Sequence, residues 1–158
     1  MENRKIIAVV GATGAQGNGV INAILNDKSG GFTPRAITRN ASSDKAKALA
    51  AMGVEVVEAD VDNKESLVKA FTGAYGAFCV TFFWEHFSPE KENQHARNMA
   101  EAAKEAGVGH VIWSILEDTR KWIPLDDDRM PTLHGKYKVP HFDAKGEANA
   151  YFEKSGVP

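Results

Sequence analysis

Residues 6–17 read IIAVVGATGAQG, and this stretch predicts how the fold begins. Ile6 to Val10 is a continuous run of apolar, mostly β-branched residues, which is typical of a strand buried on both faces of a parallel sheet. Further along, apolar residues recur at helical spacing: Val20, Ile21, Ile24 and Leu25. Gly30-Gly31 follows them and ends the predicted helix. The stretch therefore predicts a strand, a glycine-rich turn and a helix, in that order.

Strands and helices continue to alternate along the rest of the chain. Further strands are predicted at residues 34–38, 54–57, 75–81 and 108–114. Helices are predicted between them, and a last helix follows Pro140, reaches about Lys154 and turns three residues toward the sheet: Phe142, Ala150 and Tyr151. Residues 117–140 lack periodicity, so we expect a long loop there. Because parallel neighbours need crossover connections, the pattern predicts an α/β fold, a doubly wound, Rossmann-like parallel sheet of about five strands with helices on both faces.

Three of the predicted helices begin at residues that can cap them. Ser42 is the expected N-cap of the second helix, and Asp62 with Glu65 resembles a capping box at the start of the third. Residues 88–90, Ser-Pro-Glu, combine a cap, a first-turn proline and an early acid. They mark the start of a long helix that ends near Gly107.

The end of the chain repeats a pattern seen twice before it. Residues 53–54 and 107–108 both read Gly-Val, and each pair ends a predicted helix and leads into a strand. Residues 155–158, Ser-Gly-Val-Pro, begin the same pattern. We therefore expect the amino-terminal part of a longer fold, truncated before a sixth strand; a frayed natural tail is the alternative. A sheet that stopped there would leave an unpaired edge, which favours association into a homodimer.

Length and composition limit the classes of protein that fit. The chain has 158 residues, of which 43% are hydrophobic and 25% charged, a balance typical of one globular domain, which we place at residues 1–158. Its net charge of −2 and its scattered lysines and arginines predict no direct binding of nucleic acid. The apolar run at residues 6–10 is too short for a membrane helix. With one cysteine in the chain, we expect a cytoplasmic protein, with the nucleus as a further location.

Metal binding and cysteine chemistry are not expected. The five histidines, at positions 86, 95, 110, 134 and 141, show no close metal-ligand spacing and have no accompanying cysteines. Cys79 lies inside a predicted strand, where a small buried side chain is more common than a nucleophile.

The turn after the first strand has the glycine spacing G-x-x-G-x-x-G. Glycines there allow a tight turn and a close approach to a pyrophosphate, whose charge is stabilised by free N–H groups and by the positive end of the helix. The place of the motif between a buried strand and an amphipathic helix favours a dinucleotide site over a purely structural turn. The residues predicted to bind the cofactor here are Gly11, Thr13, Gly14, Ala15, Gln16 and Gly17.

The end of the second strand distinguishes the two nicotinamide cofactors. An acidic residue there hydrogen-bonds the ribose 2′-hydroxyl of NAD, whereas an arginine accommodates the 2′-phosphate of NADP. The sequence reads Thr38-Arg39-Asn40, without an acid, and Arg39 lies 22 positions after Gly17. This predicts NADP(H) as the cofactor; a solvated arginine at the end of a strand is the alternative.

Two further candidates follow predicted strands at the same edge of the sheet. Asp60 is placed to accept a hydrogen bond from the adenine amine, and a plain loop residue is an equal alternative. Thr81 opens the run Thr81-Phe82-Phe83-Trp84, which is placed to line the cofactor cleft unless its rings are simply packed. We include Asp60 and Thr81 in the predicted cofactor site.

Four segments together resemble the NmrA-like family, atypical members of the short-chain dehydrogenase/reductase superfamily. They are residues 11–17, 38–40, 80–85 and 141–147, the last reading HFDAKGE, and the resemblance covers essentially the whole chain. The glycine pattern is common to the superfamily, whereas the last segment is more specific. The resemblance implies NADP(H) binding, with some members acting as redox-sensing regulators of other proteins and some relatives reducing quinones. It also implies a carboxyl-terminal substrate or partner domain, which residues 1–158 do not contain.

The resemblance places three residues at the catalytic positions of ordinary short-chain reductases. Ser114 matches the assisting serine and Lys145 the lysine, but His141 stands where those enzymes carry the tyrosine that protonates the substrate. A neutral histidine beside a lysine cation is a poor acid, so we assign no catalytic residue among the three. Lys145 is instead expected to bind the nicotinamide ribose, and a solvated helix lysine is the alternative.

The residues and the resemblance together predict an NADP(H)-binding, non-catalytic protein that senses redox state or regulates a protein partner, as in the control of transcription. The alternative is an NADPH-dependent reductase of the atypical short-chain type with a quinone-like substrate. A third hypothesis is a fragment that binds neither cofactor nor partner. Turnover of NADPH with quinones distinguishes the first two.

Overall fold

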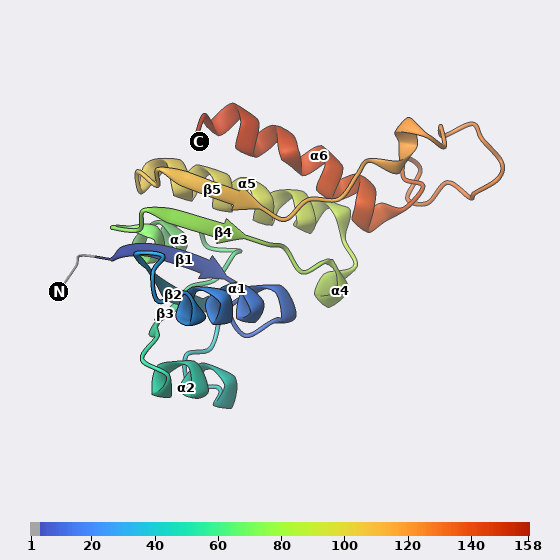
Figure 1. The fold of residues 1–158 in the computed structure, drawn as a ribbon. Helices are drawn as coiled ribbons and strands as arrows, with labels where there is room; N and C mark the ends of the chain where they lie inside the picture. The colour runs from blue at the N-terminus through green and yellow to red at the C-terminus, as the bar shows by residue number, and fades with distance from the viewer. Residues whose placement is uncertain (1–3) are drawn as a thin grey trace.

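The computed structural model describes residues 4–158, which form a parallel sheet covered by helices on both faces (Figure 1). The strands are β1 (Lys5–Val10), β2 (Phe32–Thr38), β3 (Glu55–Glu58), β4 (Gly76–Cys79) and β5 (His110–Trp113). They lie in the order β3-β2-β1-β4-β5, and all neighbours are parallel. This confirms the predicted doubly wound, Rossmann-like α/β sheet.

Helices separate the strands along the chain, and the last one follows β5. They are α1 (Ala15–Asn26), α2 (Asp44–Ala51), α3 (Lys64–Phe71), α4 (Phe83–His86), α5 (Pro89–Glu105) and α6 (Pro140–Ser155), with a 3₁₀ turn η1 (Thr119–Lys121). None of the helices within residues 4–158 is both long and apolar enough to cross a bilayer.

Alternating side chains of β1 supply the two halves of the core. Val9 packs with Ile21 of α1 and Leu49 of α2 on one face of the sheet. Its neighbour Val10 belongs to the opposite cluster, with Leu67 of α3. Because successive strand residues point to opposite faces, a strand buried on both sides must be apolar throughout, as residues 6–10 are.

The strand order creates a crevice at the carboxyl edge of the sheet. From β1 the chain proceeds to β2 and β3 on one side, and it returns to the other side of β1 for β4 and β5. The loops that follow β1 and β4 therefore diverge. In open α/β sheets, ligands bind at this kind of switch point.

Two predicted helix caps are wrong by one residue. α2 is capped by Ser43 rather than Ser42, and α3 by Asn63 rather than Asp62; both side chains accept a hydrogen bond from the first turn. At each site adjacent polar residues compete for the cap, and the local backbone decides between them. The predicted capping box does not form, because the Asp62 carboxylate lies 2.8 Å from Nε2 of His95.

The region after β4 also differs from the prediction. The strand ends at Cys79 rather than at residue 81, so Val80 and Thr81 leave the sheet. The short helix α4 follows, where the sequence shows no periodicity and predicts no element. Ser88 then caps α5 as predicted, and its hydroxyl oxygen accepts a hydrogen bond from the Lys91 N–H at 3.2 Å.

The last helix begins where predicted, but its buried face is different. α6 packs mainly against α5, and small alanines on its inner face permit the close approach. The contact with the sheet comes from Phe152, which stacks on Trp113 with ring centroids 4.8 Å apart. The residues expected to face the sheet are only partly buried: Phe142, Ala150 and Tyr151.

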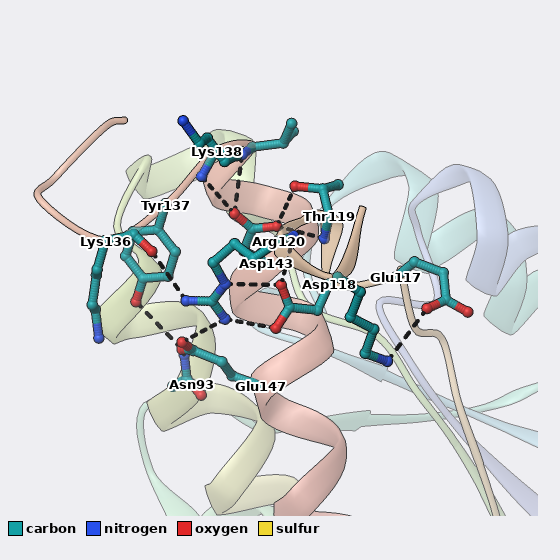
Figure 2. Close-up of polar contacts among 12 residues, drawn as sticks. Asn93, Glu117, Asp118, Thr119, Arg120, Lys136, Tyr137, Lys138, Asp143 and Glu147 are labelled. Atoms are coloured by element: carbon teal, nitrogen blue, oxygen red, sulfur yellow. Dashed lines mark hydrogen bonds and ion pairs between the residues drawn. The ribbon is translucent and has the colours of Figure 1, made fainter. Parts of the chain in front are cut away.

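A polar network fixes the loop that precedes α6 (Figure 2). Asp143 in the first turn of α6 is fully buried. Its carboxylate accepts hydrogen bonds from the N–H and the hydroxyl of Thr119 at 2.8 and 2.6 Å. It also accepts from the backbone N–H groups of Lys138 and Val139 at 2.7 and 3.0 Å. One carboxylate therefore holds both ends of the loop against the start of α6.

Arg120 forms the second part of this network (Figure 2). Its Nε donates to Asp118 at 2.8 Å, and its Nη2 donates to Glu147 of α6 at 2.9 Å. The hydrogen bonds from Arg120 hold the pKa of the Asp118 carboxyl below its ordinary value. The network gives α6 a fixed start, and this start carries His141 and Lys145 of the candidate site.

The outer edge of β5 is partly covered by the last residues of the chain. The Val111 N–H donates to the Pro158 carbonyl oxygen at 2.6 Å. Ile112 and Ile115 beside it are 55% and 50% exposed. This apolar surface lies at the edge where we expect association, and the homodimer stays a prediction.

Candidate functional site

A cavity lies on each side of the glycine turn, at the carboxyl edge of the sheet. The first has a volume of about 370 Å³ and is bordered by the end of β2, the loop after it and the loop after β3. The second, of about 380 Å³, is bordered by the start of α1, the segment after β4 and α6. Four residues line both, so the cavities are two ends of one crevice: Gly11, Gly14, Phe82 and Glu85.

Two positions of the glycine turn exclude a side chain. Gly11 has a φ of +65°, in the left-handed region that favours glycine, and a Cβ there would lie 2.3 Å from Cζ of Phe82. At Gly17 a Cβ would lie 2.3 Å from the carbonyl oxygen of Gly11. The first turn of α1 can therefore lie this close to the turn only because residue 17 has no side chain.

The start of α1 is free to bind an anion. Gly14 is its N-cap, no side chain caps the helix, and its first turn carries no acid. The first N–H groups of a helix have no partner within the helix, and they carry the positive end of its dipole. Thr13 lines the first cavity, whereas Ala15, Gln16 and Gly17 line the second, so the helix start lies between them.

The first cavity holds Arg39 and an acid that the sequence does not predict there. The Arg39 side chain is 58% exposed, and its Nη2 lies 2.8 Å from Oε1 of Glu85 on α4. Ser43 and Lys45 line the same cavity. Two cations and a hydroxyl at one end of a crevice suit a phosphate monoester.

Asp60 does not line either of these cavities. It lies exposed in the turn after β3, where its Oδ1 accepts a hydrogen bond from the Asp62 N–H at 2.9 Å. These contacts agree with the loop-residue alternative, and the adenine role stays a prediction. Asp62 lines the first cavity, together with His95, and its hydrogen bond to His95 lowers the pKa of the Asp62 carboxyl.

Lys145 lies at the inner end of the second cavity and has internal partners. The residue is 8% exposed, and its Nζ donates to Oγ1 of Thr81 at 2.5 Å. The same Nζ lies 3.1 Å from Oε1 of Glu92, a fully buried residue of α5 that also accepts a hydrogen bond from the Thr81 hydroxyl. Lys145 is therefore not a solvated helix lysine.

Ser114 and His141 line the same cavity as Lys145. The Ser114 hydroxyl donates to Oε1 of Gln16 at 2.8 Å. The His141 ring lies against Trp84, with centroids 4.6 Å apart, and burial lowers the pKa of its imidazole. A lowered pKa favours the neutral form of the ring at pH 7. Among the described residues that line this cavity, Lys145 is the cation.

The structure places the possible metal-ligating and thiol side chains as follows. Residues 4–158 contain no group of three histidine, cysteine or acidic side chains placed to hold a metal ion. Cys79 is buried in β4, and burial raises the pKa of its thiol to about 12. A thiol with that pKa is not ionised at neutral pH and is a poor nucleophile.

Comparison with known proteins identifies the family. The family model described as "NmrA-like family" matches residues 3–158. The chain belongs to the NmrA-like family. A similar curated protein is the NmrA-like family domain-containing oxidoreductase notA of Aspergillus sp. (strain MF297-2), which is 35% identical over 162 residues. That match covers 98% of this chain and 44% of the relative.

Solved structures share the fold of this NmrA-like chain. The negative transcriptional regulator NmrA in complex with NADP has a TM-score of 0.77 and 26% identity, over 99% of this chain and 44% of that one. NmrA has also been solved with NAD. The NADPH-dependent quinone oxidoreductase QOR2 of Escherichia coli, solved with NADPH, has a TM-score of 0.71 and 27% identity, over 96% and 46% of the two chains. The present chain thus spans less than half the length of these relatives.

Four polar side chains at this NmrA-like site were not predicted from the sequence: Glu85, His86, Glu92 and His95. A signal exists for two of them, because Glu92 and His95 share the helical spacing of the buried alanines of α5. Glu85 and His86 lie on the four-residue helix α4, which is too short to show a period. Their contact with distant residues comes from the tertiary fold.

Proposed function

We propose that the chain binds NADP(H) along the crevice and that the whole protein is an NADPH-dependent reductase of a quinone-like substrate. The 2′-phosphate would lie on Arg39 and Lys45, the pyrophosphate at the start of α1, and the nicotinamide beside Lys145. The observation that carries the proposal is this order: cations in the first cavity, an uncapped helix start between, and a buried lysine in the second.

The second cavity suits a quinone better than an ordinary ketone. Reduction of a ketone forms a strongly basic alkoxide, which needs a good acid, whereas reduction of a quinone forms a phenolate whose conjugate acid has a pKa of about 10. The lowered pKa of His141 makes its ring a poor proton donor, while Lys145 in the same cavity is placed to stabilise the negative charge of a phenolate. The names of notA and QOR2 support an oxidoreductase.

The choice of cofactor can be tested at Arg39. Arg39→Asp should weaken NADPH binding by about tenfold or more, because a charge-assisted contact with the 2′-phosphate contributes roughly 1.5–3 kcal/mol. NADH, which lacks this phosphate, should bind as before. Fluorescence titration of both cofactors gives the two dissociation constants. Arg97→Asp, an exposed site on α5, is the matched control; equal losses for both cofactors at Arg39 would refute the assignment.

Catalysis can be tested with a panel of quinones. The protein should oxidise NADPH in the presence of 1,4-naphthoquinone, and Lys145→Met should lower the rate constant about 100-fold, the usual scale for a lost acid. His141→Tyr should extend turnover to ketones by restoring the acid of ordinary short-chain reductases. A protein that binds NADPH and yet reduces no quinone would contradict the reductase proposal.

That negative result would favour a second function, a redox-sensing regulator. The tyrosine is replaced by His141, and NmrA, a structural neighbour, is a negative transcriptional regulator. A regulator would bind NADP(H), change its contact with a protein partner in the cytoplasm or nucleus, and turn nothing over. The two proposals share the cofactor site and differ in the role of Lys145.

A further inference from the structure

A cluster of buried polar side chains lies behind Lys145, on the side away from the second cavity. Its central residue is Glu92, which is fully buried. The Glu92 carboxylate accepts a hydrogen bond from the Thr81 hydroxyl, and its Oε1 lies 3.1 Å from Nζ of Lys145. Removing a carboxylate from water is costly, so a buried one needs close partners. These two partners occupy one oxygen of Glu92 and leave its Oε2 to other groups.

Two histidines continue the cluster on the far side of Glu92. Nε2 of His86 lies 3.6 Å from Oε2 of Glu92, and Nδ1 of His86 accepts the Ser88 N–H at 3.0 Å. Because Nδ1 is an acceptor, the neutral ring carries its proton on Nε2, the atom nearest Glu92. The rings of His86 and His95 meet edge to face, with centroids 5.3 Å apart.

His95 connects this interior to the first cavity. Its side chain is 6% exposed, and its Nε2 lies 2.8 Å from Oδ1 of Asp62, whose side chain is 55% exposed. Lys91 is the other charged group near that carboxylate, at 4.0 Å. The cluster therefore begins at a buried lysine in one cavity and ends at a solvated carboxylate in the other.

This cluster contains buried polar atoms that have no hydrogen-bond partner among the described residues. Within residues 4–158, the buried side-chain N and O atoms that lack a hydrogen-bond partner are Nε2 of His86, Oε2 of Glu92 and Nδ1 of His95. A buried polar atom without a hydrogen bond lowers the free energy of unfolding, and such atoms are rare in proteins. The ion pair between Lys145 and Glu92 would form equally well without these three atoms. Three polar atoms of this kind are what one buried water molecule typically binds.

We propose that Asp62, His95, Glu92 and Thr81 form a proton relay that returns a proton from solvent at the first cavity to Lys145 at the second. A water molecule would join Nδ1 of His95 to Glu92. His86 is a positioning residue, because its Nε2 lies 3.6 Å from Oε2 of Glu92 and its Nδ1 accepts the Ser88 N–H. The inference rests on the proposed reductase function.

The relay completes the proton balance of quinone reduction. Bound NADPH would supply the quinone with a hydride, that is two electrons and one hydrogen, and would become NADP⁺. The resulting phenolate takes a proton from the Lys145 ammonium and becomes the hydroquinone. The neutral amine would leave Glu92 as an unpaired buried anion. In the relay, His95 begins with its hydrogen on Nδ1, accepts a proton from solvent at Nε2 beside Asp62, and releases the Nδ1 hydrogen through the water molecule to Glu92. The protonated Glu92 then gives a proton to the Thr81 hydroxyl oxygen as that hydroxyl gives its own hydrogen to the amine.

The test compares Glu92→Gln and His95→Gln with His110→Gln, an exposed histidine at the start of β5. Both relay variants should lower the rate constant for 1,4-naphthoquinone reduction about tenfold or more and increase the solvent isotope effect in D₂O. The dissociation constant of Glu92→Gln for NADPH should stay within about twofold, because Glu92 lines neither cavity. Asp62→Asn, at an exposed position, gives the same test without altering the interior. His110→Gln should match the unmodified protein.

A second readout needs neither cofactor nor turnover. In ¹⁵N NMR spectra of the free protein, Glu92→Gln should move the resonance of Nδ1 of His95 and leave that of His110 in place. The relay is overturned if that resonance does not move, or if the variants keep the unmodified rate and isotope effect while quinone is reduced. If the unmodified protein binds NADPH but reduces no quinone, the reductase proposal fails first and the relay fails with it.

Discussion

Replacing Gly17 with alanine should abolish useful NADPH binding. The new Cβ would lie 2.3 Å from the carbonyl oxygen of Gly11, a backbone atom that cannot move without moving the turn. The start of α1 would shift away from the turn, and its N–H groups would no longer converge on the pyrophosphate. We expect at least about a 100-fold loss of affinity, roughly 2.8 kcal/mol, measured by fluorescence titration.

Gly19→Ala on the same helix is the matched control. A Cβ at Gly19 meets nothing within 4 Å, so the substitution should leave NADPH binding unchanged. It should also stabilise the protein slightly, because alanine favours a helix over glycine by about 0.5–1 kcal/mol. If Gly17→Ala bound NADPH as well as Gly19→Ala does, the close approach of α1 to the turn would not matter for the cofactor.

Among the variants proposed for this protein, Asp143→Ala should lower the free energy of unfolding the most. The carboxylate is fully buried and accepts hydrogen bonds from Thr119, Lys138 and Val139, so its removal leaves several buried donors without a partner. Each unsatisfied group costs about 1–3 kcal/mol, and we expect the free energy of unfolding to fall by about 3–5 kcal/mol. The start of α6 would loosen, and quinone reduction should fall with it.

Urea denaturation of the variant and of Asp126→Ala measures this effect. Asp126 is an exposed acid of the same loop and should change the free energy of unfolding by less than about 0.5 kcal/mol. Equal stability of the two variants would show that the network of Figure 2 does not hold the loop.

Apolar runs and glycine turns in the sequence predict the strands and helices well. The prediction fails at helix caps, where adjacent polar residues compete for the same position. Residues 6–17 specify β1, the turn and α1, because a buried parallel strand and a glycine turn each need particular residue types. The predictions at Ser42 and Asp62 miss the caps by one position, since adjacent polar residues have similar capping strength. The sequence assigns Phe142, Ala150 and Tyr151 to the inner face of α6, but the helix packs on α5 and buries the small residues Ala144 and Ala148 instead.

The sequence predicts the residues that line the crevice of the candidate site, but not the buried charged side chains behind Lys145. The glycine turn, Arg39 and Lys145 follow from motifs with fixed spacing. Glu92 and His95 lie in a helix that carries several other Glu and Lys residues, where a charged residue normally points to solvent. Their spacing relative to the alanines of α5 is a weak signal, and the packing of α5 between α3 and α6 shows that both side chains point inward.

Parallel calorimetric titrations of the unmodified protein with NADPH and with NADH test the central claim, that the crevice is an NADP(H) site with Arg39 at its 2′-phosphate end. We predict saturable binding of one NADPH per chain, with a dissociation constant about tenfold or more below that for NADH. Equal dissociation constants, or no binding of NADPH, would contradict the claim.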